Sequence, residues 1–324
     1  MSSAHPSDPQ RKLVRADPTT IRGKFLVGYR GWYTCPGDGP VLVQGNEWAH
    51  WTNEQGRFDP ELVPDPAYYS SNDLLTGPNN QSRVFSSRNT SVVRRHLNIM
   101  AQHKIDGVFL TRRGDEIAAA YQGGNGLGTM KMRSEVINSV FRAAEAEGRV
   151  VSVMYDLAGM PSHQLENWIA GDWEFMLNQK HVLDSPAYIR EHGRPVIAIW
   201  GVGFKNANQD PQAVLNLIHR LSDAAGGAYV ILGVPITWQK QDNSWQTVYK
   251  MADAIAPLSI GTLVDDETVD NWSKDVQQPA IQSLRNGAKK TDYVSVVWPG
   301  HEVRKATNRV GLRYDWLICV HRVS

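Results

Sequence analysis

The stretch SEVINSVFRAAEAEGRVVSVMYD, residues 134–156, contains the repeating unit of the fold. Its first part has the spacing of an amphipathic helix, with Ser134 as the expected N-cap and Gly148 as the expected stop. Its second part, VVSVMYD (150–156), is almost wholly apolar and rich in Val, which is typical of a strand buried on both faces. A helix followed directly by a buried strand predicts one unit of a parallel sheet.

The same unit recurs along the chain. Helical spacing appears again at 91–103 and 211–224. About seven such units favour an α/β fold of the (β/α)₈ TIM-barrel type over an open doubly wound sheet. The Gly-rich run at 123–128 follows no clear strand and is interpreted as a flexible loop. The other predicted strands are FLVGY (25–29), GVFLT (107–111), PVIAIWGVGF (195–204), AYVILGVPITW (228–238), AIAPLSIG (254–261) and YVSVVWPG (293–300).

The C-terminal end does not supply an eighth unit. WLICV (316–320) has the composition of a strand, but only four residues follow it. We therefore expect a barrel that is incomplete at its last strand, with an open sheet edge that makes the protein marginally stable and prone to aggregate. The expected organisation is a disordered polar lead-in at 1–22, a (β/α) barrel at 23–300 and a separate tail at 301–324.

Composition and motifs exclude several functions. The chain carries 34 basic and 33 acidic side chains without a Lys/Arg block, so no nucleic-acid partner is expected. No apolar run approaches the ~20 residues of a membrane span, and the N-terminus lacks the apolar part of a secretory signal. Cys35 and Cys319 form no framework, and the motifs of zinc enzymes, serine hydrolases and P-loop proteins are missing. We expect a cytoplasmic monomer with no membrane contact, no metal and no cofactor.

Aromatic and acidic residues gather where the predicted strands end, which is where barrels of this class carry their reactive groups. Aromatic rings pack against the C–H face of a pyranose, and carboxylates and Arg bind its hydroxyl groups, so the predicted partner is a carbohydrate or a glycosylated small molecule. The second strand ends in Thr111-Arg112-Arg113, with Asp115 just beyond. The candidate substrate-binding residues are Tyr29, Trp32, Asp38, Trp51, Tyr155, Asp156, Trp200, Trp238 and Trp298.

Asp156 is the best single candidate for a catalytic acid, because it follows a buried strand directly. The alternative is that its carboxylate only caps the N–H groups of the following loop. Glu302 is a possible mate for a two-carboxylate mechanism, although its surroundings, HEVRK, also fit a solvated face. The sequence leaves the catalytic residues otherwise unassigned.

An ordered set of motifs resembles the endo-α-mannosidase-like glycoside hydrolases, family 99 and the related family 71-type barrels, including proteins labelled "xylosidase/arabinosidase". The likeness covers about residues 24–300, so it implies that the barrel predicted at 23–300 is glycosidase-like and that the tail at 301–324 is divergent. It is carried by GYRGWYTCPGDG (28–39), WAHW (48–51), VFSSRNTSVVRRHLNIMAQHKIDGVFLTR (84–112), VVSVMYDLAG (150–159), SPAYIREHGRPVIAIWGVGF (185–204), VILGVPITW (230–238) and VVWPG (296–300).

The resemblance implies a (β/α)₈ barrel that acts on α-linked sugars with retention and without a metal. It also implies a glutamate pair at the end of the final strand, in a motif such as E-W-H-E-G-T or D-E-V-D-E-G-T. One glutamate would act as general acid/base, and the other would assist the substrate's own 2-hydroxyl. This chain has no such motif, and it reads WPGHEVRKATN where the relatives carry a W/F/Y-P-G-F-S-W-H-N pattern.

Three functions therefore stay open. The first is a glycoside hydrolase relative for α-linked glycans that lacks the C-terminal catalytic strand and could be inactive. The second is a non-catalytic carbohydrate-binding protein. The third is an accessory protein of a small-molecule biosynthetic pathway.

Overall fold

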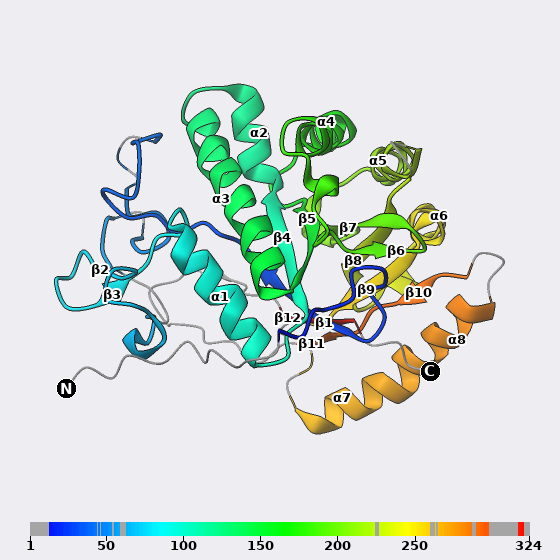
Figure 1. The fold of residues 1–324 in the computed structure, drawn as a ribbon. Coiled ribbons are helices and arrows are strands. Elements are labelled where there is room, and N and C mark those ends of the chain that lie inside the picture. Colours follow the sequence, from blue (N-terminus) through cyan, green and yellow to red (C-terminus); the bar gives the residue numbers. More distant parts are fainter. Residues whose placement is uncertain are drawn as a thin grey trace.

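The computed structural model describes residues 13–43, 45, 47–53, 55–58, 63–223, 227–259, 263, 265–286, 290–297 and 317–320. A curled, mostly parallel sheet forms the centre of the molecule (Figure 1). Its parallel strands follow one another around the sheet in chain order, and each pairs with the next. The strands are β1 (Lys24–Tyr29), β4 (Gly107–Arg113), β5 (Val150–Asp156), β7 (Arg194–Trp200), β8 (Tyr229–Pro235), β9 (Ala254–Leu258) and β10 (Asp292–Tyr293).

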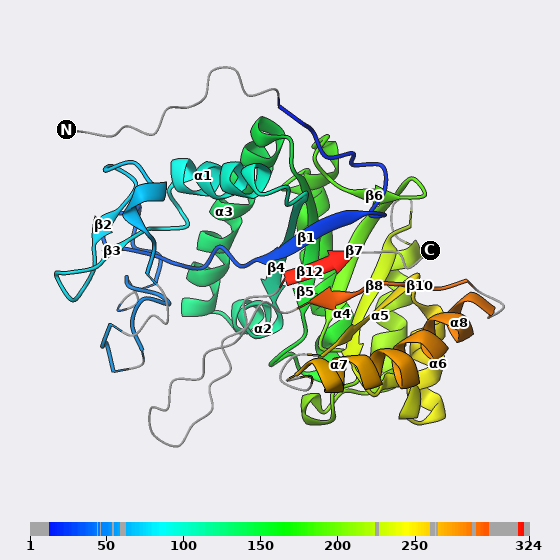
Figure 2. The same cartoon turned by 90° about the horizontal axis from the view of Figure 1, so that it is seen from below.

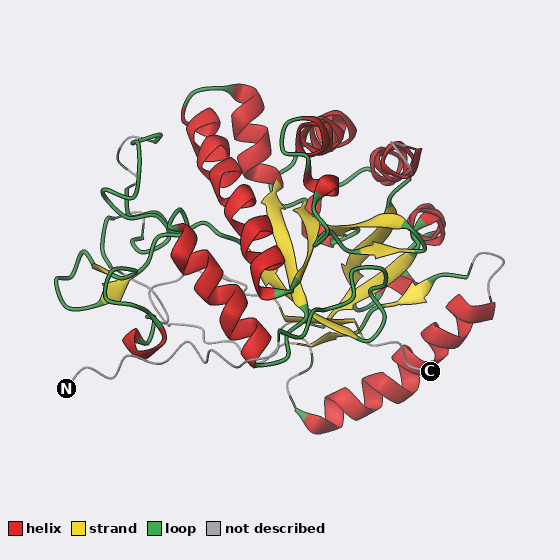
Figure 3. Cartoon of the chain, viewed as in Figure 1, coloured by secondary structure: helices red, strands yellow, loops and turns green. Residues whose placement is uncertain are grey.

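Helices cover the outer face of this sheet (Figure 3). Most of them connect consecutive parallel strands, as a β/α repeat requires. A π-helical turn at Ser273–Gln277 joins the last two helices into one rod. The helices are α1 (Thr90–Gln102), α2 (Gly114–Gln122), α3 (Asn125–Glu147), α4 (Leu165–Asn178), α5 (Pro211–Asp223), α6 (Asn243–Met251), α7 (Asp266–Trp272) and α8 (Gln278–Asn286).

Two short pairings lie outside the main sheet order. β2 (Leu75–Thr76) and β3 (Arg83–Val84) form an antiparallel hairpin within the long connection between β1 and α1. β6 (Arg190–Glu191) pairs with β7 in the antiparallel sense. The predicted strands at 25–29, 107–111, 150–156, 195–204, 228–238 and 254–261 each correspond to one strand of the parallel sheet, and the α/β class with a curled parallel sheet is confirmed. The run predicted as one strand at 293–300 contains parts of two short strands, 292–293 and 296–297, and its residues 298–300 lie outside the described residues.

The edge of β1 that faces away from β4 is covered by the C-terminal part of the chain (Figure 2). β12 (Leu317–Val320) pairs with β1 in the antiparallel sense, and β11 (Val296–Val297) pairs with β12. β10 and β11 are nearly continuous, so one segment contacts β9 at its start and β12 at its end. No parallel strand completes the sheet within the described residues, as expected. The expected open edge beside β1, however, is occupied by an antiparallel strand.

Side chains of each strand alternate between two layers. On the outer face, Val108, Val153 and Ile199 pack with helical residues in the larger hydrophobic core. On the concave face, Phe109 and Met154 belong to a second core that contains no residue of α1–α8. Successive side chains of a strand point to opposite faces of the sheet. The position of a residue near the end of a strand therefore determines whether its side chain lies on the concave face or on the helical face.

The helix that precedes β5 begins earlier than the sequence indicates. Residues 125–128 of the predicted loop lie in the first turn of α3, and Ser134 lies inside the helix, where its hydroxyl donates to Met130 O at 2.7 Å. A Cβ at Gly126 would come within 2.2 Å of the Ala119 backbone of α2. Gly126 therefore allows α2 and α3 to pack closely, whereas Gly123 and Gly124, both with positive φ, form the turn between the two helices. The predicted stop is confirmed, since Gly148 is a left-handed C-cap.

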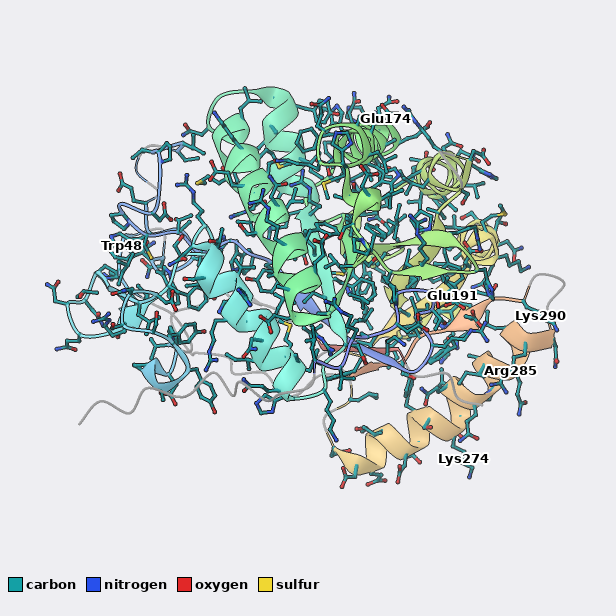
Figure 4. The ribbon with its side chains drawn as sticks, viewed as in Figure 1. Trp48, Glu174, Glu191, Lys274, Arg285 and Lys290 are labelled. Carbon is teal, nitrogen blue, oxygen red and sulfur yellow. The ribbon has the colours of Figure 1, made fainter. Side chains whose placement is uncertain are left out.

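Residues 13–22 contact the sheet and helices. The disordered lead-in expected at 1–22 is therefore wrong for this part, and residues 1–12 lie outside the described residues. Glu191, labelled in Figure 4, lies on β6. It accepts from Thr20 Oγ1 at 2.6 Å, from the Ile21 N–H at 2.8 Å and from Arg22 Nε at 2.9 Å. Burial opposes ionisation of Glu191, but these hydrogen bonds outweigh it and lower its pKa. The domain boundaries themselves stay a prediction.

Replacing Glu191 with Gln tests this contact. The amide has nearly the size of the carboxylate but lacks the negative charge that accepts hydrogen bonds from Thr20, Ile21 and Arg22. We therefore expect the free energy of unfolding to fall by about 1–3 kcal/mol. Urea unfolding at pH 7 measures the change. Glu174→Gln is the matched control, because Glu174 makes an exposed pair with Arg220 at 3.1 Å and should cost less than about 0.5 kcal/mol. Equal losses in the two variants would contradict the assigned role of Glu191.

Candidate functional site at the carboxyl end of the sheet

The carboxyl ends of β1, β4 and β5 bring polar side chains together on the concave face. Arg113 and Asp156 are partners in the parallel register of β4 and β5. The Arg113 guanidinium also lies 5.6 Å from the ring of Trp32, which follows β1. Asp115, in the first turn of α2, completes the group. We call Trp32, Arg113, Asp115 and Asp156 the mouth cluster.

Arg113 is the centre of the mouth cluster. Its Nε donates to Asp115 Oδ1 at 2.9 Å, and its Nη2 donates to the other carboxylate oxygen, which makes a bidentate pair. These hydrogen bonds to Asp115 are the largest cause of the raised pKa of Arg113. They outweigh burial, and the charge of Asp156 contributes further. Arg113 is 27% and Asp115 44% exposed, so both remain within reach of a ligand.

Trp32 is a covered ring rather than an open platform. The His50 imidazole stacks on it at 3.8 Å between ring centroids with an interplanar angle of 14°. The Arg30 guanidinium lies 4.4 Å from its centroid, and only 7% of Trp32 is exposed. The polar groups of Arg113 and Asp115 are therefore more accessible than this indole.

Asp156 is half-buried and partly engaged. Its Oδ1 accepts the Ala158 N–H at 3.1 Å, so the loop-capping alternative is realised in the structure. Its partner in register on the other side is Trp200, a buried ring of the concave core. The indole of Trp200 occupies the space above Gly233, where a Cβ would come within 2.5 Å of the ring. Trp200 thus forms the apolar floor beside the carboxylate.

Three of the predicted residues lie in the outer layer instead. Tyr29, Tyr155 and Trp238 belong to the core between sheet and helices. The Tyr29 hydroxyl is 3.0 Å from Nδ1 of His96 on α1. Because strand residues alternate, Tyr155 and Asp156 point to opposite faces of the sheet. The expectation that all strand-end rings converge on one opening is therefore not met by these three.

Asp38 and Trp51 stabilise the connection between β1 and α1. Asp38 accepts from the Cys35 N–H at 2.9 Å, from Ser86 Oγ at 2.6 Å and from Arg88 Nη1 at 2.7 Å. The Trp51 indole N–H donates to the Phe85 carbonyl at 2.9 Å. Both therefore hold this connection together and do not belong to the mouth cluster. Trp298, His301 and Glu302 lie outside the described residues.

Sequence reasoning named Arg113 and Asp115 at a strand end but did not select them, and it missed His50. No local signal distinguishes His50, since its role depends on the stacking with Trp32.

Among the described residues, no group of three His, Cys, Asp or Glu side chains could hold a metal ion. No helix within the described ranges is long and apolar enough to cross a membrane.

The sheet and its helices define a mixed α/β fold with a curled, mostly parallel sheet. Two solved structures of the GH99 endo-α-mannosidase from Bacteroides thetaiotaomicron are similar to it. One aligns with a TM-score of 0.53 and 16% sequence identity over 90% of this chain and 74% of the other. The second, in complex with bis-tris propane, aligns with a TM-score of 0.51, again at 16% identity, over 90% and 72% of the two chains.

The resemblance noted in the sequence is thus confirmed at the level of the fold. At this identity the likeness establishes the architecture and not the activity. No protein-family model matches the chain, and no curated protein does.

Proposed function

We propose that this chain is a glycoside hydrolase-like protein that binds α-linked glycans at the mouth cluster. The observation that carries the proposal is the meeting of Arg113, Asp115 and Asp156 at the carboxyl end of a curled parallel sheet. In barrels of this class that end holds the ligand. The shared architecture with endo-α-mannosidase structures supports an α-linked glycan as the ligand.

The chemistry of the cluster suits sugar hydroxyls. A guanidinium provides donors in a fixed plane, and two carboxylates provide acceptors, so neighbouring hydroxyl groups of one ring could be bound from both sides. Asp156 is the candidate catalytic carboxylate, and the retaining, metal-free reaction implied by the resemblance belongs to the proposal. In the proposed architecture the (β/α)₈ barrel is incomplete in its last parallel strand.

A non-catalytic carbohydrate-binding protein is the second candidate. One observation favours it: the Asp156 carboxylate is engaged with a backbone N–H. Loss of a general acid/base alone lowers a rate by about 10²–10⁴. The two candidates share the binding site and differ only in turnover.

Calorimetry with α-linked mannooligosaccharides tests the shared part. We expect saturable binding, and we expect Asp156→Asn to weaken it at least about tenfold, because a hydrogen bond to a charged group contributes about 1.5–3 kcal/mol. Asp106→Asn is the matched control. Asp106 is also half-buried and also accepts one N–H, that of Phe25 at 2.8 Å, but at the amino end of the sheet.

Each outcome has a definite reading. Binding that Asp156→Asn weakens and Asp106→Asn leaves unchanged supports the site. No binding by the unaltered protein, or equal losses in both variants, overturns it. Product analysis of the same mixtures then separates the candidates, since released sugar that disappears in Asp156→Asn indicates a hydrolase.

A further inference from the structure

A cavity of about 450 Å³ lies among α2, α3 and α4, on the helical side of the sheet. These three helices stand next to one another (Figure 1). The volume falls in the range of small-molecule sites. The cavity shares no residue with the mouth cluster, and the proposed glycan-binding function does not use it.

The floor of the cavity contains a buried cation. Arg112 is only 2% exposed, and it holds the Asp172 carboxylate with two donors, Nε at 3.0 Å and Nη2. Its other terminal nitrogen, Nη1, has no hydrogen-bond partner among the described residues. A buried guanidinium with a spare donor beside an open volume is suited to bind an anion.

Two lysines add to this charge. Lys131 on α3 and Lys180, just after α4, also line the cavity, so three cationic side chains face one carboxylate, that of Asp172. The pKa of Lys180 is lowered, first by burial and then by the charge of Arg112, which indicates a positive field there. Glu135 acts on Lys180 in the opposite sense, but its carboxylate is paired with Arg88 at 2.8 Å.

The walls of the cavity are apolar. Ile117, Met130 and Phe175 line it beside the cations. The ring of Tyr121, which is also part of the lining, is held in a stack on Trp168 at 5.1 Å and 6°. A bare inorganic ion would leave these walls uncovered, whereas an aromatic or aliphatic body would bury them.

We propose that this cavity is a binding site for a small organic anion, in which a carboxylate or phosphate group meets Arg112, Lys131 and Lys180 and an apolar body packs against Phe175 and Tyr121. A neutral glycan lacks the charge that the site complements. The cavity is thus a second ligand site, on the opposite face of the sheet from Asp156.

Calorimetry with phenyl phosphate as the probe tests the site. We expect saturable binding at least about tenfold tighter than that of phenol or of inorganic phosphate, because only the probe uses both the cations and the walls. The Lys131→Gln/Lys180→Gln variant should weaken binding at least about tenfold. Ala120→Trp, which fills the cavity from α2, should abolish it without changing the charge.

Lys104→Gln/Lys240→Gln is the matched control, since both lysines are exposed and lie outside the cavity lining. It should keep the Kd within about twofold, because it alters the net charge equally. Failure of phenyl phosphate to saturate, equal affinity for inorganic phosphate, or unchanged affinity in either cavity variant would overturn the proposal. These readouts require no turnover, so they are independent of the proposed function.

Discussion

Replacing Asp172 with Asn should lower the free energy of unfolding by about 3–5 kcal/mol, because it leaves the Arg112 guanidinium buried without its counter-charge. The two side chains are only 2% and 5% exposed, and they form a bidentate pair between β4 and α4. The pKa of Arg112 is raised even though burial opposes its charge, since Asp172 outweighs the burial. Denaturant unfolding at pH 7 measures the change.

A double variant separates the cost of an unpaired charge from the contribution of the pair. Arg112→Met/Asp172→Leu removes both charges and keeps apolar volume, so it should recover most of the loss seen in Asp172→Asn. If Asp172→Asn costs less than about 1 kcal/mol, or if the double variant is as unstable as the single one, the pair is not desolvated as the structure indicates.

Acid should destabilise the protein through His96, by about 3 kcal/mol between pH 6.5 and 4. The hydroxyls of Tyr29 and Tyr69 each lie 3.0 Å from one nitrogen of this imidazole. The neutral ring can accept from one hydroxyl and donate to the other. Burial lowers the pKa of His96 to about 4, and the nearby Asp73 opposes this only in part.

The direction of the effect follows from proton binding. The unfolded chain protonates His96 near pH 6.5 and the folded chain only near pH 4. Between these values the unfolded state binds the extra proton, so stability is full above pH 6.5 and falls as the pH is lowered. The comparison is urea unfolding of the unaltered protein and of His96→Gln at several pH values.

The difference between the two pH profiles isolates His96 from the carboxylates that titrate in the same range. His103→Gln is the control, because His103 is exposed at the end of the same helix, and it should leave the profile unchanged. If His96→Gln has the same pH dependence as the unaltered protein, the imidazole is not held neutral in the folded state.

The parallel strands could be predicted from sequence because each is an apolar run bounded by polar segments. The start of α3 could not, because the Gly-rich run resembles a loop and the role of Gly126 depends on the close approach of α2. Nothing local in LICV indicates that it pairs with β1 in the antiparallel sense, since that partner lies at the other end of the chain.

The mouth cluster was predictable only in part. Asp156 could be chosen because it ends a buried strand, and the alternation of side chains also implies that Tyr155 faces the other way. The covering of Trp32 by His50 depends on a loop that is held by long-range contacts, such as the hydrogen bond from the Trp51 indole to the Phe85 carbonyl. The number of aromatic residues near the strand ends therefore overstates how many aromatic rings are accessible at the mouth cluster.

The most direct test of the account is hydrogen–deuterium exchange with and without an α-linked mannooligosaccharide at saturating concentration. We predict slower exchange in peptides that contain residues 30–32, 113–115 and 156–158, with no change in α4 or around Lys180. Slower exchange elsewhere only, or no change in any peptide, would contradict the claim that the carboxyl end of this sheet binds glycans.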